Sequence, residues 1–184
     1  MLPWKKIGVA AACALAVSAC ESQPANPYSG VPATRDAPPA CAADFARRAG
    51  ELVLPPTVSP ATKQTGKSEP LRIANTIAYN RRLDASARWT EFDDGWSSLA
   101  LRLKSDGAKS ISVHLTEATL PTGTQIWLCS PDGLTRQGPY RDVMDGELWT
   151  SVVPGSQAWL EVLVPTAQRD GLKIRLAEIF GGYD

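Results

Sequence analysis

The sequence lacks most of the patterns on which enzymatic and nucleic-acid-binding sites depend. It contains a single histidine, His114, and no serine stands in a Gly-x-Ser-x-Gly context, so a hydrolase triad of nucleophile, base and orienting acid has no candidate arrangement. Its 19 Lys and Arg residues are balanced by 19 Asp and Glu residues, whereas nucleic-acid-binding domains carry a clustered basic excess. We therefore expect a protein that is not an enzyme and binds no nucleic acid.

Metal-ligand spacing is also missing. The 4 cysteines are far apart and are accompanied by 1 histidine, whereas zinc sites gather four such ligands at short spacings. Acidic residues cluster beside glycine in "TEFDDGW" (90–96) and "RDVMDGE" (141–147), which is typical of turns, with Ca²⁺ binding by their oxygens as the alternative. We expect no metal site and no cofactor.

The N-terminus has the order of an export signal. Lys5 and Lys6 precede the apolar run "IGVAAACALAV" (7–17), and two small residues follow before Cys20, as in the charged, apolar and cleavage regions of a signal peptide. The apolar run is too short for a membrane span, which needs about 20 helical residues. Residues 1–19 are therefore predicted to be removed.

The ending "VSAC" (17–20) resembles the lipobox of bacterial lipoproteins, in which the cysteine thiol receives a diacylglycerol and the new amine is usually acylated. The resemblance implies that Cys20 is the lipidation site, and two or more acyl chains give stable membrane anchoring. Glu21 follows Cys20, where an Asp would resemble an inner-membrane retention signal. The predicted location is the outer membrane, with the protein facing the periplasm or the surface.

Two cysteines remain in the mature chain once Cys13 leaves with the signal and Cys20 carries lipid. Export to an oxidising compartment permits a disulfide between Cys41 and Cys129. The bridge would close a loop of about 90 residues and stabilise the fold by roughly 4 kcal/mol in the chain-entropy model. Two separate buried thiols are the alternative.

Composition divides the mature chain into a tether, a linker and a domain. Prolines recur among Ser, Ala, Asn and Gln through residues 20–40, a composition that predicts a flexible, disordered tether. "CAADFARRAGELVL" (41–54) can form one short helix before Pro55 and Pro56, and a polar stretch follows. We expect a short helix and linker over residues 41–70 and a domain over residues 71–184.

Within that domain the apolar residues alternate with polar ones, which predicts strands. The clearest runs are "LALRLK" (99–104), "ISVHLT" (111–116), "WLEVLV" (159–164) and "LKIRLAEI" (172–179). Turn signals such as Asp106-Gly107 and Asp170-Gly171 separate them. Short strands without helical patterns between them indicate an all-β, antiparallel β-sandwich of jelly-roll type, with His114 turned outward as a surface residue.

Three stretches of this domain resemble a known region of other proteins. They are "LPTGTQIWLCSPDG" (120–133), "GPYRDVMDGELWTSVVPGSQAWLEVLVP" (138–165) and "RWTEFDDGWSSLALRLKSDGAKSISVHL" (88–115). In their order they resemble the non-catalytic β-rich region that precedes the protease domain in secreted bacterial trypsin-like serine peptidases of the lysyl-endopeptidase type. The resemblance implies the fold of an accessory region without the protease domain, and it carries over no catalytic residue.

Trp159 and Leu163 are the candidate binding patch, because alternation places them opposite Leu160, Val162 and Val164. Exposed together they would suit a partner or a sugar ring, while the alternative is a second covered face under residues 41–54. The predicted function is a non-enzymatic envelope lipoprotein that is anchored to the membrane by lipid and binds a protein partner such as a protease. A carbohydrate- or cell-wall-binding module and the front fragment of a split trypsin-like peptidase are the alternatives.

Overall fold

The computed structural model describes residues 36–58, 73–86 and 88–183 of the chain. The chain divides into Met1–Pro32, none of which is described, and Ala33–Asp184, which contains every described element. The predicted signal peptide, Cys20 and most of the predicted tether thus lie outside the described residues, as does the linker from residue 59 onward.

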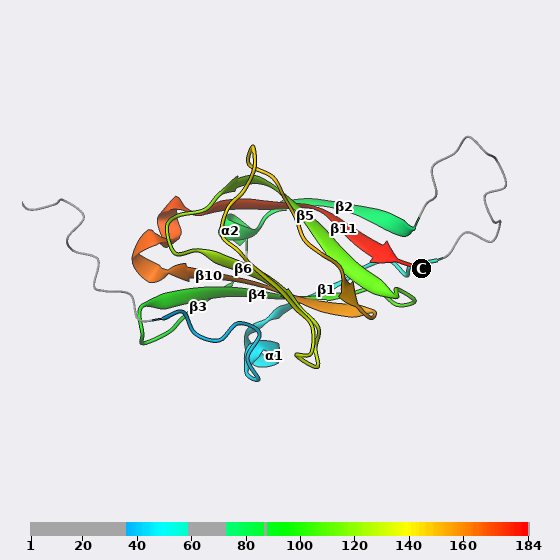
Figure 1. Ribbon diagram of the computed structural model, residues 1–184, viewed down its shortest axis with the longest axis horizontal. Coiled ribbons are helices and arrows are strands. Elements are labelled where there is room, and N and C mark those ends of the chain that lie inside the picture. Colours follow the sequence, from blue (N-terminus) through cyan, green and yellow to red (C-terminus); the bar gives the residue numbers. More distant parts are fainter. Residues whose placement is uncertain (1–35, 59–72, 87, 184) are drawn as a thin grey trace, which may run out of the picture. The chain divides into compact units, whose positions relative to one another are not determined.

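Two β-sheets packed face to face form the domain, which confirms the all-β sandwich (Figure 1). Sheet A has the strand order β1-β4-β10-β6-β7, with β3 also paired to β4. Its strands are β1 (Gly50–Val53), β3 (Trp89–Glu91), β4 (Trp96–Lys104), β6 (Gln125–Cys129), β7 (Arg136–Tyr140) and β10 (Gln157–Pro165). The pairings are antiparallel apart from the parallel contact of β1 with β4.

Sheet B has the order β2-β11-β5-β8, with β9 also paired to β5, and its pairings are antiparallel. Its strands are β2 (Ala74–Arg82), β5 (Ser110–Thr119), β8 (Leu148–Trp149), β9 (Val153–Pro154) and β11 (Lys173–Gly182). The helices are short: α1 (Phe45–Arg48), α2 (Leu83–Ser86) and the 3₁₀ helix η1 (Thr166–Gly171). The two sheets therefore supply nearly all of the regular structure in the described ranges.

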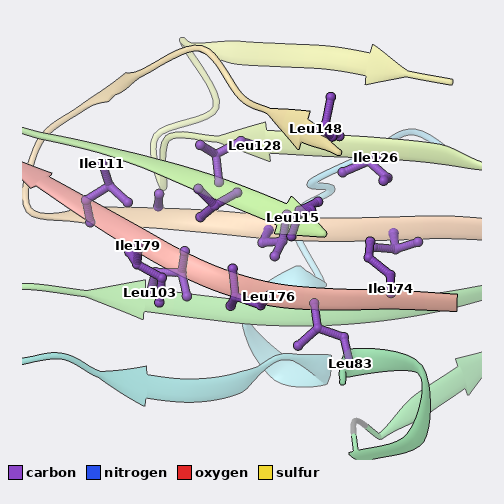
Figure 2. Packing of buried hydrophobic residues seen from close by; sticks show 14 of the residues in the cluster. Leu83, Leu103, Ile111, Leu115, Ile126, Leu128, Leu148, Ile174, Leu176 and Ile179 are labelled. Carbon is purple, nitrogen blue, oxygen red and sulfur yellow. The ribbon is translucent and has the colours of Figure 1, made fainter. Parts of the chain in front are cut away.

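The main core lies between the sheets and is built from the alternating residues that the sequence analysis placed inward. Figure 2 shows Leu103 of sheet A near Ile179 of sheet B within this core, and both side chains are 0% exposed. Burying one such side chain contributes about 1.5–3 kcal/mol. The long strands β4, β5, β10 and β11 therefore form because alternation lets them bury apolar side chains between the sheets.

A bulge changes the phase of β11 near its middle. Ile174 and Leu176 point into the core by alternation, but the next core residue is Ile179, three positions later. The register of β11 shifts between Leu176 and Glu178 against both neighbouring strands, and an extra residue of this kind re-aims the side chains that follow it. Glu178 and Phe180 are consequently turned to the outer face of sheet B.

The sandwich begins before the predicted residue 71. Residues 41–70 were expected to form a short helix and a linker, and α1 is such a helix, but β1 adds a strand to the edge of sheet A beside β4. Leu52 packs against the main core, and Leu54 is 5% exposed. Residues 50–53 are too few and too close to Pro55 for their own sequence to indicate a strand. The strand depends on pairing with β4, about 50 residues further along the chain.

Candidate functional site

The predicted binding patch of Trp159 and Leu163 is covered. Both side chains lie on the outer face of sheet A, as alternation predicts, yet Leu163 is 1% exposed. The ring of Phe45 stacks on Trp159 with 4.6 Å between the ring centroids. A free patch at this position is therefore wrong, and the covering of this face by residues 41–54 is the arrangement found.

Residues 36–49, which we call the N-terminal segment, are fastened to sheet A by a disulfide. Cys41 is bonded to Cys129 at the end of β6, across a sequence separation of 88 residues. The bridge predicted from export is thus present, and the Cys41 and Cys129 side chains belong to a small apolar cluster that includes Trp96 and Leu163. This cluster forms a second core outside sheet A.

Glu161 is the polar anchor of the same segment. It lies between Trp159 and Leu163 on the outer face of β10 and is 0% exposed. Its carboxylate accepts hydrogen bonds from Ser98 Oγ at 2.7 Å, from Arg48 Nη2 at 3.1 Å and from the backbone N–H of Cys41. A buried carboxylate is costly unless it is paired and hydrogen-bonded, so these donors are what allow the charge to be buried.

Arg48 links this carboxylate to the rest of the N-terminal segment. Its Nε donates to Asp44 Oδ2 at 2.8 Å, and its guanidinium lies over the Phe92 ring at 5.0 Å from the centroid. The hydrogen bond from Arg48, helped by its positive charge, outweighs partial burial and lowers the pKa of the Asp44 carboxyl below its ordinary value of 3.8. The segment is therefore a fixed part of the domain and closes the outer face of sheet A around Trp159.

An apolar groove of about 420 Å³ lies on the outer face of sheet B. It forms because small residues of three adjacent strands stand beside large apolar side chains. The small residues are Ala74 of β2, Ser110 and Ser112 of β5 and Gly182 of β11; the large ones are Ile73, Trp149, Val152 and Phe180. Ile73, Trp149 and Val152 are 60%, 55% and 55% exposed, an amount of clustered apolar surface that is typical of a binding site.

Trp149 forms a wall of this groove and is held by ring contacts, although it is exposed. Its ring stacks on the His114 ring, with 3.6 Å between centroids and 13° between planes, and it lies 5.6 Å from the Phe180 ring. The backbone of β8 pairs Trp149 with His114. The indole is thus held in place before a ligand arrives, which lowers the entropic cost of binding.

His114 was expected to be a surface residue and is instead 8% exposed. Alternation correctly turns it away from the main core, but Trp149 then covers it. Its Nδ1 lies 3.2 Å from Glu178 Oε2, and its Nε2 lies 3.4 Å from Glu147 Oε2. The imidazole therefore supports the indole and lies between two carboxylates, with Nδ1 in hydrogen-bonding distance of Glu178.

Glu147 and Glu178 form an acidic pair around His114, which lies under the groove residue Trp149. Their side chains are 54% and 35% exposed. Over the part of the chain that is described, His114 is the only side chain that pairs with either carboxylate. Two solvent-accessible carboxylates thus stand next to an apolar surface.

The sequence analysis missed this site, although a signal for it was present. In "GELWTSVV" (146–153), alternation places Trp149 opposite its buried neighbour Leu148. The strand β8 has 2 residues, too few to show a period, so only its pairing with β5 determines which way Trp149 points.

Metal or membrane-spanning features do not appear in the described ranges. No group of three or more His, Cys, Asp or Glu side chains in residues 36–58, 73–86 and 88–183 is arranged to hold a metal ion. Within the same ranges no helix has the length and apolar character needed to cross a bilayer. The predicted lipidation site Cys20 lies outside them.

The chain was compared with protein-family models and with curated proteins. No protein-family model matches the chain, and none of the curated proteins is significantly similar to it.

Proposed function

We propose that the chain is a non-enzymatic lipoprotein of the cell envelope, anchored through Cys20, whose sandwich binds a partner protein at the groove of sheet B. The anchor part of the proposal is supported by the signal-like residues 1–19 and by "VSAC". Stable attachment requires two or more acyl chains. The outer membrane is the proposed location.

The observation that carries the binding part is the exposed, pre-positioned Trp149. An indole that is 55% exposed costs the isolated protein solvation free energy, and aromatic residues in apolar depressions are the usual centres of protein–protein contacts. The opposite outer face is filled by the N-terminal segment, with Phe45 on Trp159. A protein partner is therefore proposed for sheet B.

The absence of enzymatic activity remains part of the proposal. His114, the only histidine of the chain, is stacked under Trp149 and placed between two carboxylates. A general base must reach the proton that it removes. Its buried ring makes His114 better suited to hold the groove wall than to act on a substrate.

Fractionation of cells tests the anchor. The parent protein should sediment with outer membranes, and a Cys20→Ser variant should remain unprocessed or become soluble. Identical fractionation of the two proteins would contradict the anchor.

Site-specific photo-cross-linking in intact cells tests the binding face. A photoreactive amino acid at Val152, in the groove, should give a discrete protein adduct, and the adduct should disappear when Trp149→Ala is added. The same amino acid at Leu134, which is 86% exposed outside the groove, serves as the matched control. Adducts of equal yield and size at both positions, or a Val152 adduct whose yield is unchanged by Trp149→Ala, would contradict a specific binding face.

A further inference from the structure

The groove and the acidic pair each contribute one outward side chain of the same strand, β11. Phe180 and Glu178 of β11 both point outward, and successive outward side chains of a strand are about 7 Å apart. Phe180 is paired with Ser112, and Glu178 is paired with His114. Apolar surface and negative charge thus alternate along the outer face with the spacing of an extended chain.

Trp149 lies beside both pairs, Phe180 with Ser112 and Glu178 with His114. Its backbone is level with His114, while its ring reaches within 5.6 Å of the Phe180 ring. An apolar side chain in the groove would therefore touch Trp149 from one side, with Glu147 and Glu178 beside it. The hydroxyls of Ser110 and Ser112 line the groove as well and can hydrogen-bond to a backbone.

We infer that the groove of sheet B takes an extended segment of a partner protein in which a large apolar side chain and a Lys or Arg side chain stand two residues apart. This inference rests on the proposed function and adds the chemistry of the partner. In an extended peptide, side chains i and i+2 point to the same face. The first fills the groove against Trp149, and the second reaches Glu147 and Glu178, whose only paired side chain among the described residues is His114.

A protein segment fits this surface better than a glycan does. Most of the large side chains that line the groove are aliphatic or aromatic: Ile73, Trp149, Val152 and Phe180. A sugar would bury many hydroxyl groups against these apolar side chains, while only Ser110 and Ser112 supply side-chain hydroxyls among the lining residues, and unsatisfied polar groups are costly. A chain that presents one apolar and one cationic side chain satisfies both parts of the surface.

Peptide binding to the purified full-length protein in detergent tests the spacing. The probe is fluorescein-labelled Gly-Ser-Phe-Ser-Lys-Ser-Gly with an amidated C-terminus, and its partner is Gly-Ser-Phe-Lys-Ser-Ser-Gly, which has the same composition but places Lys on the opposite face. Fluorescence anisotropy should show about 2- to 5-fold weaker binding of the second peptide, the effect of one lost solvent-exposed ion pair. Equal affinities would overturn the inference.

Protein variants assign the two parts of the site. Trp149→Ala should weaken binding of the first peptide by about 30-fold, as expected for a central aromatic contact. Glu147→Gln with Glu178→Gln should remove the difference between the two peptides and reduce the salt dependence of binding. The controls are Leu134→Ala and Glu51→Gln, a carboxylate paired with Arg102 away from the groove, and neither should change the affinity.

The outcomes separate this inference from the proposed function. If Trp149→Ala removes the cross-link at Val152 in cells while the two peptides bind alike, the Lys or Arg rule is wrong and the binding face stands. If a chitotetraose probe binds in a Trp149-dependent manner and neither peptide does, a protein partner is wrong as well. If the parent protein gives neither a cellular cross-link at Val152 nor any binding of the peptides or of chitotetraose, the groove is not a binding site of any kind.

Discussion

The buried ion pair of Arg48 and Glu161 offers the most direct test of how the N-terminal segment is held. The two side chains are 11% and 1% exposed. Replacing Glu161 by Gln keeps the shape of the side chain but presents an amide N–H either to the Cys41 N–H or to the Ser98 and Arg48 donors. Neither amide orientation can accept from every donor, so the variant loses hydrogen bonds as well as charge.

The expected magnitude follows from the cost of breaking a buried pair, about 3–5 kcal/mol when one partner is removed. Arg48 keeps its hydrogen bond to Asp44 in Glu161→Gln, so we expect a loss of about 2–3 kcal/mol in the free energy of unfolding. Arg48→Met leaves the Glu161 carboxylate buried with two donors, and we expect a loss of about 3 kcal/mol. Once both charges are gone neither is stranded, so the double variant should be about 1–2 kcal/mol more stable than the sum of the single losses indicates.

Urea unfolding of the four oxidised proteins, followed by tryptophan fluorescence, measures this coupling. The control cycle uses Arg102 and Glu51, an ion pair at 2.7 Å whose side chains are 36% and 45% exposed, and there we expect a coupling below about 0.5 kcal/mol. If the Arg48 and Glu161 changes are additive within about 0.5 kcal/mol, the pair is not what fastens the segment, and the reasoning is refuted.

Three further outcomes can be measured by the same unfolding assay. Replacing Cys41 and Cys129 by Ser opens a loop of 88 residues and should cost about 4–5 kcal/mol in the chain-entropy model, and a loss below about 1 kcal/mol would contradict it. Burial raises the pKa of Asp84, but hydrogen bonds from Arg82 and the Ile174 N–H outweigh this effect and lower the pKa below 3.8. The contribution of Asp84 to the free energy of unfolding is therefore complete above pH 3.8 and is lost as the pH falls further. Asp84→Asn should make the stability depend less steeply on pH in this acid range, and an unchanged pH dependence would count against the reasoning. Gly107→Ala should lower the free energy of unfolding more than Gly95→Ala. Both glycines have positive φ, but a Cβ at residue 107 would lie 2.6 Å from the backbone oxygen of Thr57, whereas a Cβ at residue 95 would have nothing within 4 Å. Equal losses of stability in the two variants would disprove the role of that contact.

The long strands were predictable because their information is local. Strand β4 covers the predicted run 99–104 and β10 covers 159–164, and Leu99 and Leu103 of the first and Leu160 and Val162 of the second belong to the main core. Alternation needs only neighbouring residues, and one buried face is enough to select it. The turn at Asp106-Gly107 was predictable for the same reason, since Gly107 adopts φ +82°.

The candidate site was less predictable because the exposure of two tryptophans depends on distant parts of the chain. Trp159 sits in a long, well-patterned strand, but its pattern left open whether the outer face is a free patch or is covered by residues 41–54, and Phe45 covers it. Trp149 sits in a strand of 2 residues and received no assignment, yet it is 55% exposed. Alternation states which side chains share a face, but it does not state whether another part of the chain lies over that face.

The sequence alone thus determined the all-β class, the inward faces of the long strands and the pair of cysteines available for a bridge. The tertiary structure decided which outer face is open, because that depends on contacts between residues far apart in the chain. Cys41 meets Cys129, Phe45 meets Trp159 and Arg48 meets Glu161, and together these contacts close sheet A. No comparable segment covers Trp149 among the described residues. The groove of sheet B lies there, with His114 held beneath the indole by stacking and by the contact of its Nδ1 with Glu178.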